Sequence, residues 1–505
     1  MLSVVQSATI YGLEGQLIQI EVDTSQGLPG ITIVGLPDTA VNESKERIRI
    51  GLKNSGISLP QKRFILNLAP AEVKKIGTGY DLPMAMAIMK ALNEIEFDHQ
   101  DYIILGEIGL NGDIRAIQGV LPITIYAKNI GIPKIIIPID NDNEASLVDG
   151  IEILGVRNIQ EIIDHFNPNK KFIISPTKPF EIKSSYLPND IDMSNIKGQK
   201  LAKRALEIAA SGGHNVLMTG PPGAGKTLLS RTLTTILPAM DREEILDVSK
   251  IYSISGKLNA ENPLITTRPF RSPHHTASST SLIGGGSYPK PGEISLAHRG
   301  VLFLDEFPEF PRFVLESLRQ PLEDRIVTVS RAQGSITFPA DFMLIASQNP
   351  CPCGYATDPD KECTCSQNQI IKYQQKISGP LLDRIDMIIQ IEKVKTEELM
   401  SKEINEEPSI QIRNRVEKAR EIQRERFKNY KIKTNSEMNV KQIQKICILD
   451  EPSEKLIKNA ITKMNLSARA YNRILKLART IADLEENPDI KVNHIAEALQ
   501  YREKS

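Results

Sequence analysis

The stretch HNVLMTGPPGAGKT occupies residues 214–227, and LLSRTLTTIL follows it directly. An apolar run, a glycine-rich loop and a helical run in this order predict a buried strand, a phosphate-binding loop and a helix. In such a loop, backbone N–H groups surround an anion at a helix N-terminus, where the helix dipole favours negative charge. We expect Lys226 to reach the β- and γ-phosphates of a nucleotide and the Thr227 hydroxyl to bind Mg²⁺. The loop consists of Gly220, Pro221, Pro222, Gly223, Ala224, Gly225, Lys226 and Thr227.

A second apolar run, GVLFLDEF, lies at residues 300–307 and ends in two carboxylates. Ligands of open α/β sheets bind outside the carboxyl ends of the strands, so we expect these acids beside the phosphate-binding loop. Asp305 would hold Mg²⁺ through water, and Glu306 would polarise the attacking water. The alternative, an acidic surface turn, does not explain the four apolar residues that lead into the acids.

Two further segments predict residues that sense or stabilise the terminal phosphate. FMLIASQNP predicts a buried strand, and Asn349 near its end suits a sensor that positions water. The alternative is that Asn349 is a residue of an Asn-Pro turn.

SGPLLDRIDMIIQI places Arg384 between a helix end and an apolar strand. In a ring ATPase such an arginine can reach the neighbouring subunit's nucleotide, an effect worth about 10³–10⁵ in rate. A salt bridge to Asp383 or Asp386 of its own chain is the alternative.

The composition of the 505 residues is that of a globular protein, with 40% hydrophobic and 25% charged residues and a formal net charge of zero. The whole chain therefore has no global attraction to nucleic acid or anionic membranes, and contacts with DNA must come from a local patch. The absence of Trp disfavours a broad base-stacking platform. We find neither the pattern of a secretory signal nor a window of 18 consecutive apolar residues. We therefore expect a cytoplasmic protein without a membrane segment.

The sequence pattern predicts an α/β protein of three domains and one linker. Residues 1–166 alternate β-rich runs with helical stretches, and residues 167–193 are rich in Pro, Lys, Ser and Asn, which indicates a linker. Residues 194–395 form a second α/β region, and residues 396–505 are helical and charged. The β-rich runs of the first domain are GITIVGLP (30–37), RFILNLAP (63–70), YIILGEIGL (102–110) and KIIIPI (134–139).

The last domain contains SARAYNRILKLARTIADLEE, which predicts an amphipathic lid helix at residues 467–486. Arg469 stands at the start of this helix, where it could contact the phosphates. Arg473 lies one turn later and is the rival for this role. The spacing alone does not decide between the two arginines.

Taken together, the motifs resemble those of the ComM/YifB family of magnesium-chelatase-like AAA+ proteins over essentially the whole chain. The resemblance implies an AAA+ P-loop ATPase core with a helix-2 insert around 279–295 and a pre-sensor hairpin around 323–338. It supports Asn349 as sensor 1, Arg384 as the arginine finger and Arg469 as sensor 2. The motifs are GPPGAGKT, RPFRSPHHTASSTSLIGGGSYPKPGEISLAHRGVLFLDEF, LESLRQPLEDRIVTVSRAQGSITFPADF, NPCPCG, SGPLLDRID and SARAYNRILKLARTIADL.

Members of this family are described as hexameric DNA helicases that promote branch migration in recombination and help to integrate DNA in natural transformation. The resemblance therefore implies ATP and Mg²⁺ as cofactors, single-stranded or branched DNA as a partner, and self-association into a hexameric ring. Two other functions stay open. One is a chelatase-type ATPase that remodels a protein partner, and the other is an inactive relative of Lon protease.

The first domain resembles the ribosomal-S5-domain-2-like fold shared by Lon protease and RadA. LGEIGLNGDIRAIQGVLP (105–122) is similar to the Lon segment with the catalytic lysine, and KKIGTGYDLPMAMAIM (74–89) is similar to the segment with the catalytic serine. The chain departs from both, because no serine lies between Ser58 and Ser146 and the first segment has no lysine before Lys128. A Ser–Lys dyad needs both groups within hydrogen-bond reach, so we expect no peptidase activity.

Four of the five cysteines form two close pairs, Cys351-Pro-Cys353 and Cys363-Thr-Cys365. Four thiolates could form a tetrahedral structural Zn²⁺ site, although C-x-C is tighter than the usual C-x₂₋₄-C spacing. Free cytosolic thiols or a redox pair are the alternatives. Cys447 lies in an apolar helical stretch, which predicts core packing.

Two polar clusters remain. His274 and His275 have no matching carboxylates in the sequence, which favours loop hydrogen bonding over a metal site. As an alternative, Arg271 and His274 could contact nucleotide or DNA across a subunit boundary. Residues 413–433 hold nine Lys or Arg and three Glu, the strongest local basic patch. This patch is either a solvated helix face or a surface that contacts DNA phosphates.

Overall fold

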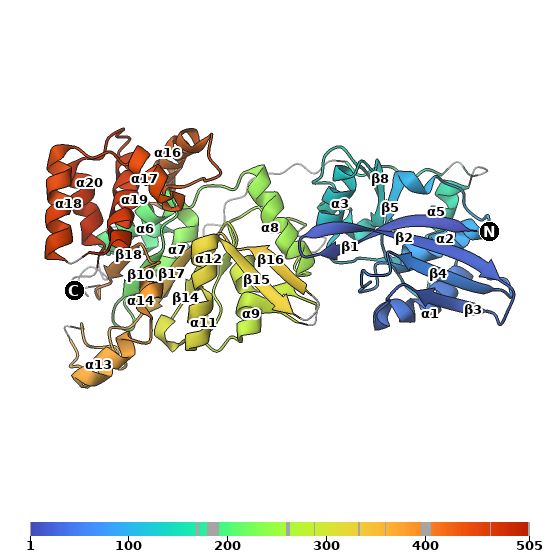
Figure 1. The fold of residues 1–505 in the computed structure, drawn as a ribbon, viewed down its shortest axis with the longest axis horizontal. Helices are drawn as coiled ribbons and strands as arrows, with labels where there is room; N and C mark the ends of the chain where they lie inside the picture. Colours follow the sequence, from blue (N-terminus) through green and yellow to red (C-terminus); the bar gives the residue numbers. More distant parts are fainter. Residues whose placement is uncertain are drawn as a thin grey trace. The chain divides into compact units, whose positions relative to one another are not determined.

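The computed structural model describes residues 2–167, 170, 172–178, 191–258, 263–286, 288–331, 334–358, 360–394, 406–464 and 466–502. The chain forms two compact units, drawn in Figure 1. The first unit comprises Met1–Lys183 and Arg242–Thr266, and the second comprises Ser184–Asp241 and Thr267–Ser505. The central part of the predicted linker lies outside the described residues.

The first unit is built on two main sheets. The larger has the strand order β1-β2-β4-β3, antiparallel except for β3 beside β4, and the smaller is the parallel sheet β5-β8-β9. The β-rich runs expected from the sequence are found as β3, β4, β5 with β6, and β8, whereas β1 and β2 were not anticipated. The strands are β1 (Ser3–Tyr11), β2 (Glu14–Ser25), β3 (Gly30–Val34), β4 (Arg63–Ala69), β5 (Tyr102–Ile104), β6 (Glu107–Ile108), β7 (Ile114–Arg115), β8 (Lys134–Pro138) and β9 (Glu152–Val156).

Helix α8 (Arg242–Ile254) follows the predicted nucleotide-binding segment in sequence but belongs to the first unit, where it packs against α3 (Val120–Asn129). A buried carboxylate, that of Glu144, ties it there by accepting hydrogen bonds from the Ser253 hydroxyl and from the backbone N–H of Leu121. Burial raises the pKa of Glu144 above its ordinary value. Residues 242–266, which lie within the predicted central domain at 194–395, thus belong to the first compact unit. The other main helices of this unit are α1 (Thr39–Asn54), α2 (Asp81–Ala91) and α5 (Ile159–Phe166).

The second unit contains a five-stranded parallel sheet with the order β11-β14-β17-β10-β18. All residues of β10 and β14 are buried, as expected for a parallel sheet that is covered on both faces. The parallel pairing brings the carboxyl ends of these strands to one edge. The strands are β10 (Val216–Thr219), β11 (Phe270–Arg271), β14 (Val301–Leu304), β17 (Met343–Gln348) and β18 (Met387–Gln390).

The C-terminal helices share one hydrophobic core with this sheet. Buried residues of β10 and β17 join those of α6, α7, α16 and α19 in a single cluster, and α16 contacts both α6 and α7. The structure therefore divides into two units, and the separate lid domain at 396–505 stays a prediction. The helices are α6 (Lys200–Gly212), α7 (Lys226–Ile236), α16 (Ser409–Phe427), α17 (Val440–Ile446), α18 (Glu451–Lys463), α19 (Ala468–Leu484) and α20 (Val492–Gln500).

Two small excursions leave the five-stranded sheet. One contains α9 (Ser279–Ile283) and the short pair β12 (Gly284–Gly285) and β13 (Lys290–Pro291). The other is the antiparallel hairpin of β15 (Ile326–Arg331) and β16 (Gly334–Pro339). They lie where the family resemblance implies an insert and a hairpin.

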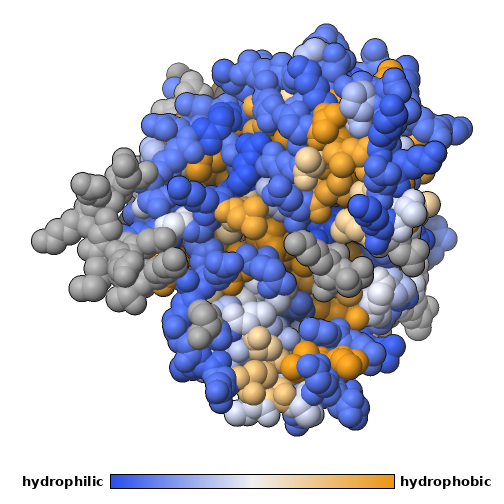
Figure 2. Space-filling view, turned by 90° about the vertical axis from the view of Figure 1, so that its left-hand side faces the viewer, coloured by the Kyte–Doolittle hydropathy of each residue, from blue (hydrophilic) through white to orange (hydrophobic). Residues whose placement is uncertain are grey.

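The surface formed by the C-terminal helices is mostly hydrophilic, with smaller hydrophobic groups between the polar side chains (Figure 2). Exposed apolar side chains in this part of the chain include Val440, Ile448 and Val492. Among the helices that the structure describes, none combines the length and apolar character that crossing a bilayer requires.

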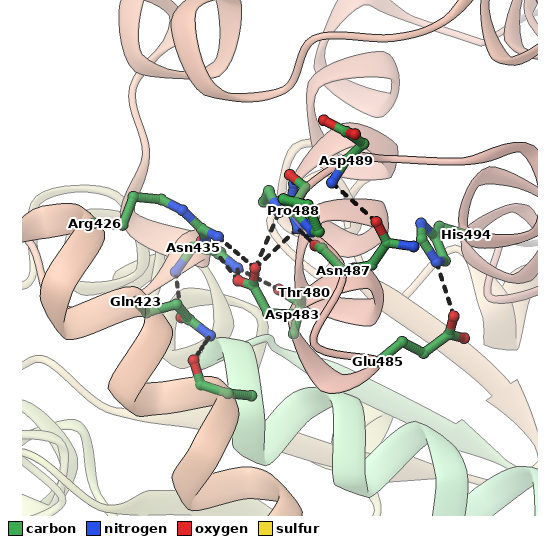
Figure 3. Close-up of polar contacts among 12 residues, drawn as sticks. Gln423, Arg426, Asn435, Thr480, Asp483, Glu485, Asn487, Pro488, Asp489 and His494 are labelled. Carbon is green, nitrogen blue, oxygen red and sulfur yellow. Dashed lines mark hydrogen bonds and ion pairs between the residues drawn. The ribbon is translucent and has the colours of Figure 1, made fainter.

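A buried ion-pair network joins three of the C-terminal helical segments. The Asp483 side chain is fully buried; it accepts hydrogen bonds from Arg426 (2.6 Å) and from the Asn435 amide (2.8 Å), as Figure 3 shows. Arg479, only 2% exposed, also donates to Asp483 at 3.1 Å and to the carbonyl oxygen of Pro488 at 2.6 Å. Asp483 therefore balances the charge of two arginines inside the protein.

Replacing Asp483 with Ala should lower the free energy of unfolding of this unit by about 3–5 kcal/mol, because it leaves buried guanidinium charge without a partner. Glu486→Ala is the matched control. Glu486 pairs with Lys418 on the surface, and such pairs contribute about 0–1 kcal/mol. Thermal unfolding followed by circular dichroism measures both changes, and equal melting temperatures for the two variants would contradict the assignment.

Candidate nucleotide-binding site

A cavity of about 430 Å³ opens at the carboxyl ends of β10, β14 and β17. It is lined by residues 222–228, by Asp305 and Glu306, and by residues 347–349. The sheet order places β14, β17 and β10 side by side, which explains how three segments so far apart in sequence reach one site. The volume is within the ordinary range for small-molecule sites, about 300–1,000 Å³.

The loop before α7 depends on glycine at two places. Gly225 precedes the helix with φ +85°, in the left-handed region where a side chain is strained. Gly220 lies against the backbone of Ile391, and an added Cβ would be 2.4 Å from its carbonyl oxygen. The loop thus turns tightly and leads into α7 of 11 residues, whose first N–H groups have no partner within the helix.

Lys226 is 9% exposed and is the first residue of α7, at the end of this loop. Its ammonium group donates to the carbonyl oxygens of Gly220 (2.6 Å) and Pro221 (3.0 Å) and to Oδ1 of Asn349 (3.1 Å). Burial lowers the pKa of Lys226 below its ordinary value, and the nearby carboxylates Asp305 and Glu306 oppose this change. The structure thus brings Asn349 and the lysine of this loop together.

Asp305 follows β14 and meets two hydroxyl groups. Thr227 Oγ1 donates to Asp305 Oδ2 at 2.8 Å, and the Ser347 hydroxyl donates to Oδ1. A hydroxyl and a carboxylate at this separation form the oxygen-rich donor set that Mg²⁺ prefers. The sequence motifs predict Thr227 and Asp305 at this site but not Ser347, because a buried serine within an apolar strand carries no local signal.

Glu306 has a left-handed backbone, with φ +52°, and a side chain that is 53% exposed. His275 Nδ1 lies 3.2 Å from Glu306 Oε2. His275 follows β11, which pairs with β14, and this pairing brings the imidazole to the carboxylate. His274 instead bonds the Thr276 hydroxyl at 2.8 Å. Loop hydrogen bonding, as expected, therefore describes His274, whereas the sequence did not indicate that His275 contacts Glu306.

The three candidate arginines are not among the described residues that line the cavity. Arg384 pairs with Glu323 and donates to the carbonyl oxygen of Pro380 at 2.7 Å. Asp383 instead pairs with Arg469, with 3.5 Å between its Oδ2 and the Nη1 of the arginine. Arg473 donates to the carbonyl oxygen of Ile385 at 3.0 Å, and its Nε lies 3.6 Å from Oδ1 of Asp386. The expected alternative for Arg384, a pair with Asp383 or Asp386, is not the pairing found; its partner is Glu323.

Most cations of the basic segment 413–433 have partners within the chain. Arg413 and Arg420 donate to the backbone carbonyls of Thr235 and Ala210. The remaining pairs of described residues are Arg415 with Glu207 and Glu407, Lys418 with Glu486, Arg426 with Asp483, Lys428 with Glu425, and Lys433 with Asp241. This segment therefore serves mainly to join helices, and it is a weak candidate for a DNA-binding surface.

The four paired cysteines come together. Their sulfur atoms all lie within 4.8 Å of one another, and the separations of Cys351, Cys353 and Cys363 are 3.4–3.7 Å. Cys365 completes the group, and Cys447 is buried elsewhere, beside the backbone of Leu475. The loop from Cys351 begins two residues after Asn349, so the cluster adjoins the cavity in the chain.

Comparison with known proteins gives matches along the chain. Residues 192–399 match a family described as magnesium chelatase, subunit ChlI; residues 20–141 match subunit ChlI of Mg-chelatase, and residues 406–502 match its C-terminal part. Competence protein ComM of Haemophilus influenzae is 42% identical over 504 residues, 99% of this chain and 97% of that protein. YifB of Escherichia coli is 39% identical over 504 residues with the same coverage. Lon protease 2 of Bacillus subtilis is 29% identical over 198 residues, 36% of this chain and 35% of the protease.

Proposed function

Because the chain belongs to the ComM/YifB family of magnesium-chelatase-like AAA+ proteins, we propose that it is an ATP-hydrolysing motor that acts on DNA. The observation that carries the ATPase proposal is the buried Lys226 ammonium group, held at the N-terminus of α7 beside the Thr227–Asp305 pair. The name of the relative from Haemophilus influenzae, competence protein ComM, supports a role with DNA. We propose a cytoplasmic hexameric ring that drives branch migration in recombination and natural transformation.

The proposed cofactors are ATP and Mg²⁺, with Zn²⁺ as a candidate structural ion at the four cysteines. Lys226 would bind the β- and γ-phosphates in place of the carbonyl oxygens of Gly220 and Pro221. Thr227 and Asp305 would hold Mg²⁺, which neutralises the charge that develops on the phosphates when it is bound. Backbone N–H groups of the loop would bind the remaining phosphate oxygens.

Glu306 is the proposed general base, because its carboxylate is exposed at the edge of the cavity, where an attacking water can reach it. His275 would hold this carboxylate until the nucleotide is bound. Asn349 would exchange its bond with Lys226 for one with the γ-phosphate or the attacking water. The roles of His275 and Asn349 start from their contacts with Glu306 and Lys226, and the role of Glu306 starts from its place in the lining of the cavity.

Arg384 is the proposed arginine finger, supplied to the site of the neighbouring subunit. Its position away from the cavity of its own chain is consistent with action in trans, and its pair with Glu323 would hold it until a neighbouring subunit docks.

Arg469 stays the proposed sensor 2, with a side chain that is 65% exposed. Its rival Arg473 is mostly buried and is engaged with backbone carbonyls, which favours Arg469.

Glu306→Gln should bind ATP but hardly hydrolyse it, because only the activation of water is removed. Arg384→Ala should also bind ATP and lose turnover. Mixing the two proteins should restore part of the steady-state ATPase activity, since some interfaces then pair an intact Glu306 with an intact Arg384.

The control mixture combines Glu306→Gln with Lys226→Ala. Both changes act within one chain's own site, so no interface in that mixture is complete and no recovery is expected. Labelled subunits confirm that exchange occurs. Failure of the first mixture to recover, despite confirmed exchange, would contradict the action of Arg384 in trans.

A chelatase-type ATPase that remodels a protein partner is the second candidate, because residues 192–399 match magnesium chelatase subunit ChlI. The partial similarity to Lon protease 2 is the basis of a third, an inactive relative of that protease. The two ATPase candidates share the same nucleotide site. They differ in what accelerates hydrolysis.

ATP hydrolysis measured with single-stranded DNA, duplex DNA and a four-way junction separates these candidates. We expect at least one form of DNA to raise the rate, with a stimulation that weakens as salt is added, because phosphate contacts release counterions. Glu306→Gln, assayed in parallel, excludes a contaminating ATPase. Hydrolysis that no DNA accelerates would contradict the DNA motor.

A further inference from the structure

We propose that Cys351, Cys353, Cys363 and Cys365 bind one Zn²⁺ and that this ion holds the segment of Asn349 against the phosphate-binding loop. The metal site stands on the geometry of the four sulfur atoms alone. The link to nucleotide turnover rests on the proposed ATPase function.

The separations of the sulfur atoms are those of a tetrahedral thiolate site. Zn–S bonds of about 2.3 Å in a tetrahedron put neighbouring sulfur atoms about 3.8 Å apart. The sulfur atoms of Cys351, Cys353 and Cys363 are 3.4, 3.6 and 3.7 Å apart, and all four sulfur atoms lie within 4.8 Å of one another. A disulfide needs about 2.05 Å, so these sulfur atoms are arranged as ligands around a common point and not as bonded pairs.

Sulfur chemistry restricts the ion. Four thiolates in a tetrahedron select Zn²⁺ or iron over Mg²⁺ and Ca²⁺, which prefer oxygen ligands. Cys351 is fully buried, and the other three are half-buried. The site is closed by four protein ligands, which is the arrangement of structural zinc sites and leaves no open position for catalysis.

The loop that carries the cysteines is irregular, and one of its contacts is an ion pair between Asp360 and Lys393 at 2.8 Å. Between the end of β17 at Gln348 and the start of α13 (Gln367–Gln374), the described residues form no helix or strand. Its described backbone hydrogen bonds include Gly354 N to Cys351 O and Asp358 N to Tyr355 O. A metal that joins the two cysteine pairs would therefore add a cross-link within this irregular loop, and its binding free energy becomes folding free energy.

This loop touches the nucleotide site directly. Gly354 lies against the phosphate-binding loop so closely that an added Cβ would be 2.7 Å from Cδ and Cγ of Pro222 and 3.9 Å from Cγ of Asn349. Asn349 precedes Cys351 by two residues and accepts a hydrogen bond from Lys226. An ion that holds the cysteines would therefore hold the backbone of Gly354 against Pro222. It would also hold Asn349, the proposed sensor, beside the phosphate-binding loop.

Metal analysis of the purified protein by mass spectrometry tests the site. We expect about one zinc per chain and negligible iron, as for a Cys₄ structural site, with loss of the zinc from the Cys363→Ser/Cys365→Ser variant. Cys447→Ala, which removes a cysteine outside the cluster, should keep the metal. Wild-type protein without zinc, or a double variant with unchanged zinc, would overturn the metal site; stoichiometric iron would overturn the choice of metal.

The coupling is tested on wild-type protein, in case the double variant fails to fold. A chelator selective for Zn²⁺ over Mg²⁺ should raise hydrogen exchange at residues 220–227 and 349–366 and lower the affinity for ATP, and added Zn²⁺ should reverse both effects. Loss of zinc that leaves exchange at residues 220–227 unchanged would overturn the coupling. A protein that contains zinc and shows slow hydrogen exchange in these segments, but that hydrolyses no ATP under any condition, would refute the ATPase function. The metal site would still stand.

Gly354→Ala tests the packing of this loop on Pro222. It retains the four cysteines and should keep the zinc. Its Cβ would meet Pro222, and the left-handed backbone at this position (φ +88°) adds strain to the same turn, so we expect roughly a tenfold weaker affinity for ATP, the lower end of the effect of losing a residue that supports a site. Unchanged affinity with unchanged zinc would overturn the role of this contact.

Discussion

The position of one ammonium group determines how the second unit is organised. Lys226 lies where β10 gives way to α7, and three oxygen atoms from two segments hold it there. A buried cation without such partners would be strongly destabilised. To satisfy it, β17 must lie beside β10 so that Asn349 reaches the loop, and β14 then brings Asp305 to Thr227. The order of the strands and this contact together place the cavity and the proposed catalytic residues at one edge of the sheet.

The same constraint gives the site its proposed chemistry. The lysine donates to carbonyl oxygens of its own loop, which are weaker partners than a phosphate with negative charge. Glu306 and His275 stand at the edge of the same sheet, and Gly354 of the cysteine loop lies near Pro222 and Asn349. A ligand that draws Lys226 from its carbonyl partners would therefore act on Asn349 and, through it, on the cysteine loop.

Much of this site could be predicted from sequence, because the relevant signals are local. The glycine pattern, the acidic end of 300–307 and the paired cysteines each occupy a few consecutive residues, and the structure brings Lys226, Asp305 and Asn349 to one cavity. Ser347 and His275 were missed because their importance arises only from contacts between strands that are distant in sequence. The packing of Arg242–Thr266 with the first unit was missed for the same reason. Similarly, the charge run at 413–433 gave no sign that its arginines bond to α6, α7 and α19.

The most direct test of this account is the binding of Mg²⁺ and ATP, measured by isothermal titration calorimetry in the Glu306→Gln background, where turnover does not interfere. Adding Lys226→Ala should abolish measurable binding, because the phosphates lose their buried cation. Adding Arg231→Ala, which removes an exposed cation from the same helix, should leave the affinity unchanged. Equal affinities for the Lys226→Ala and Arg231→Ala proteins would contradict the claim that Lys226 organises the nucleotide site.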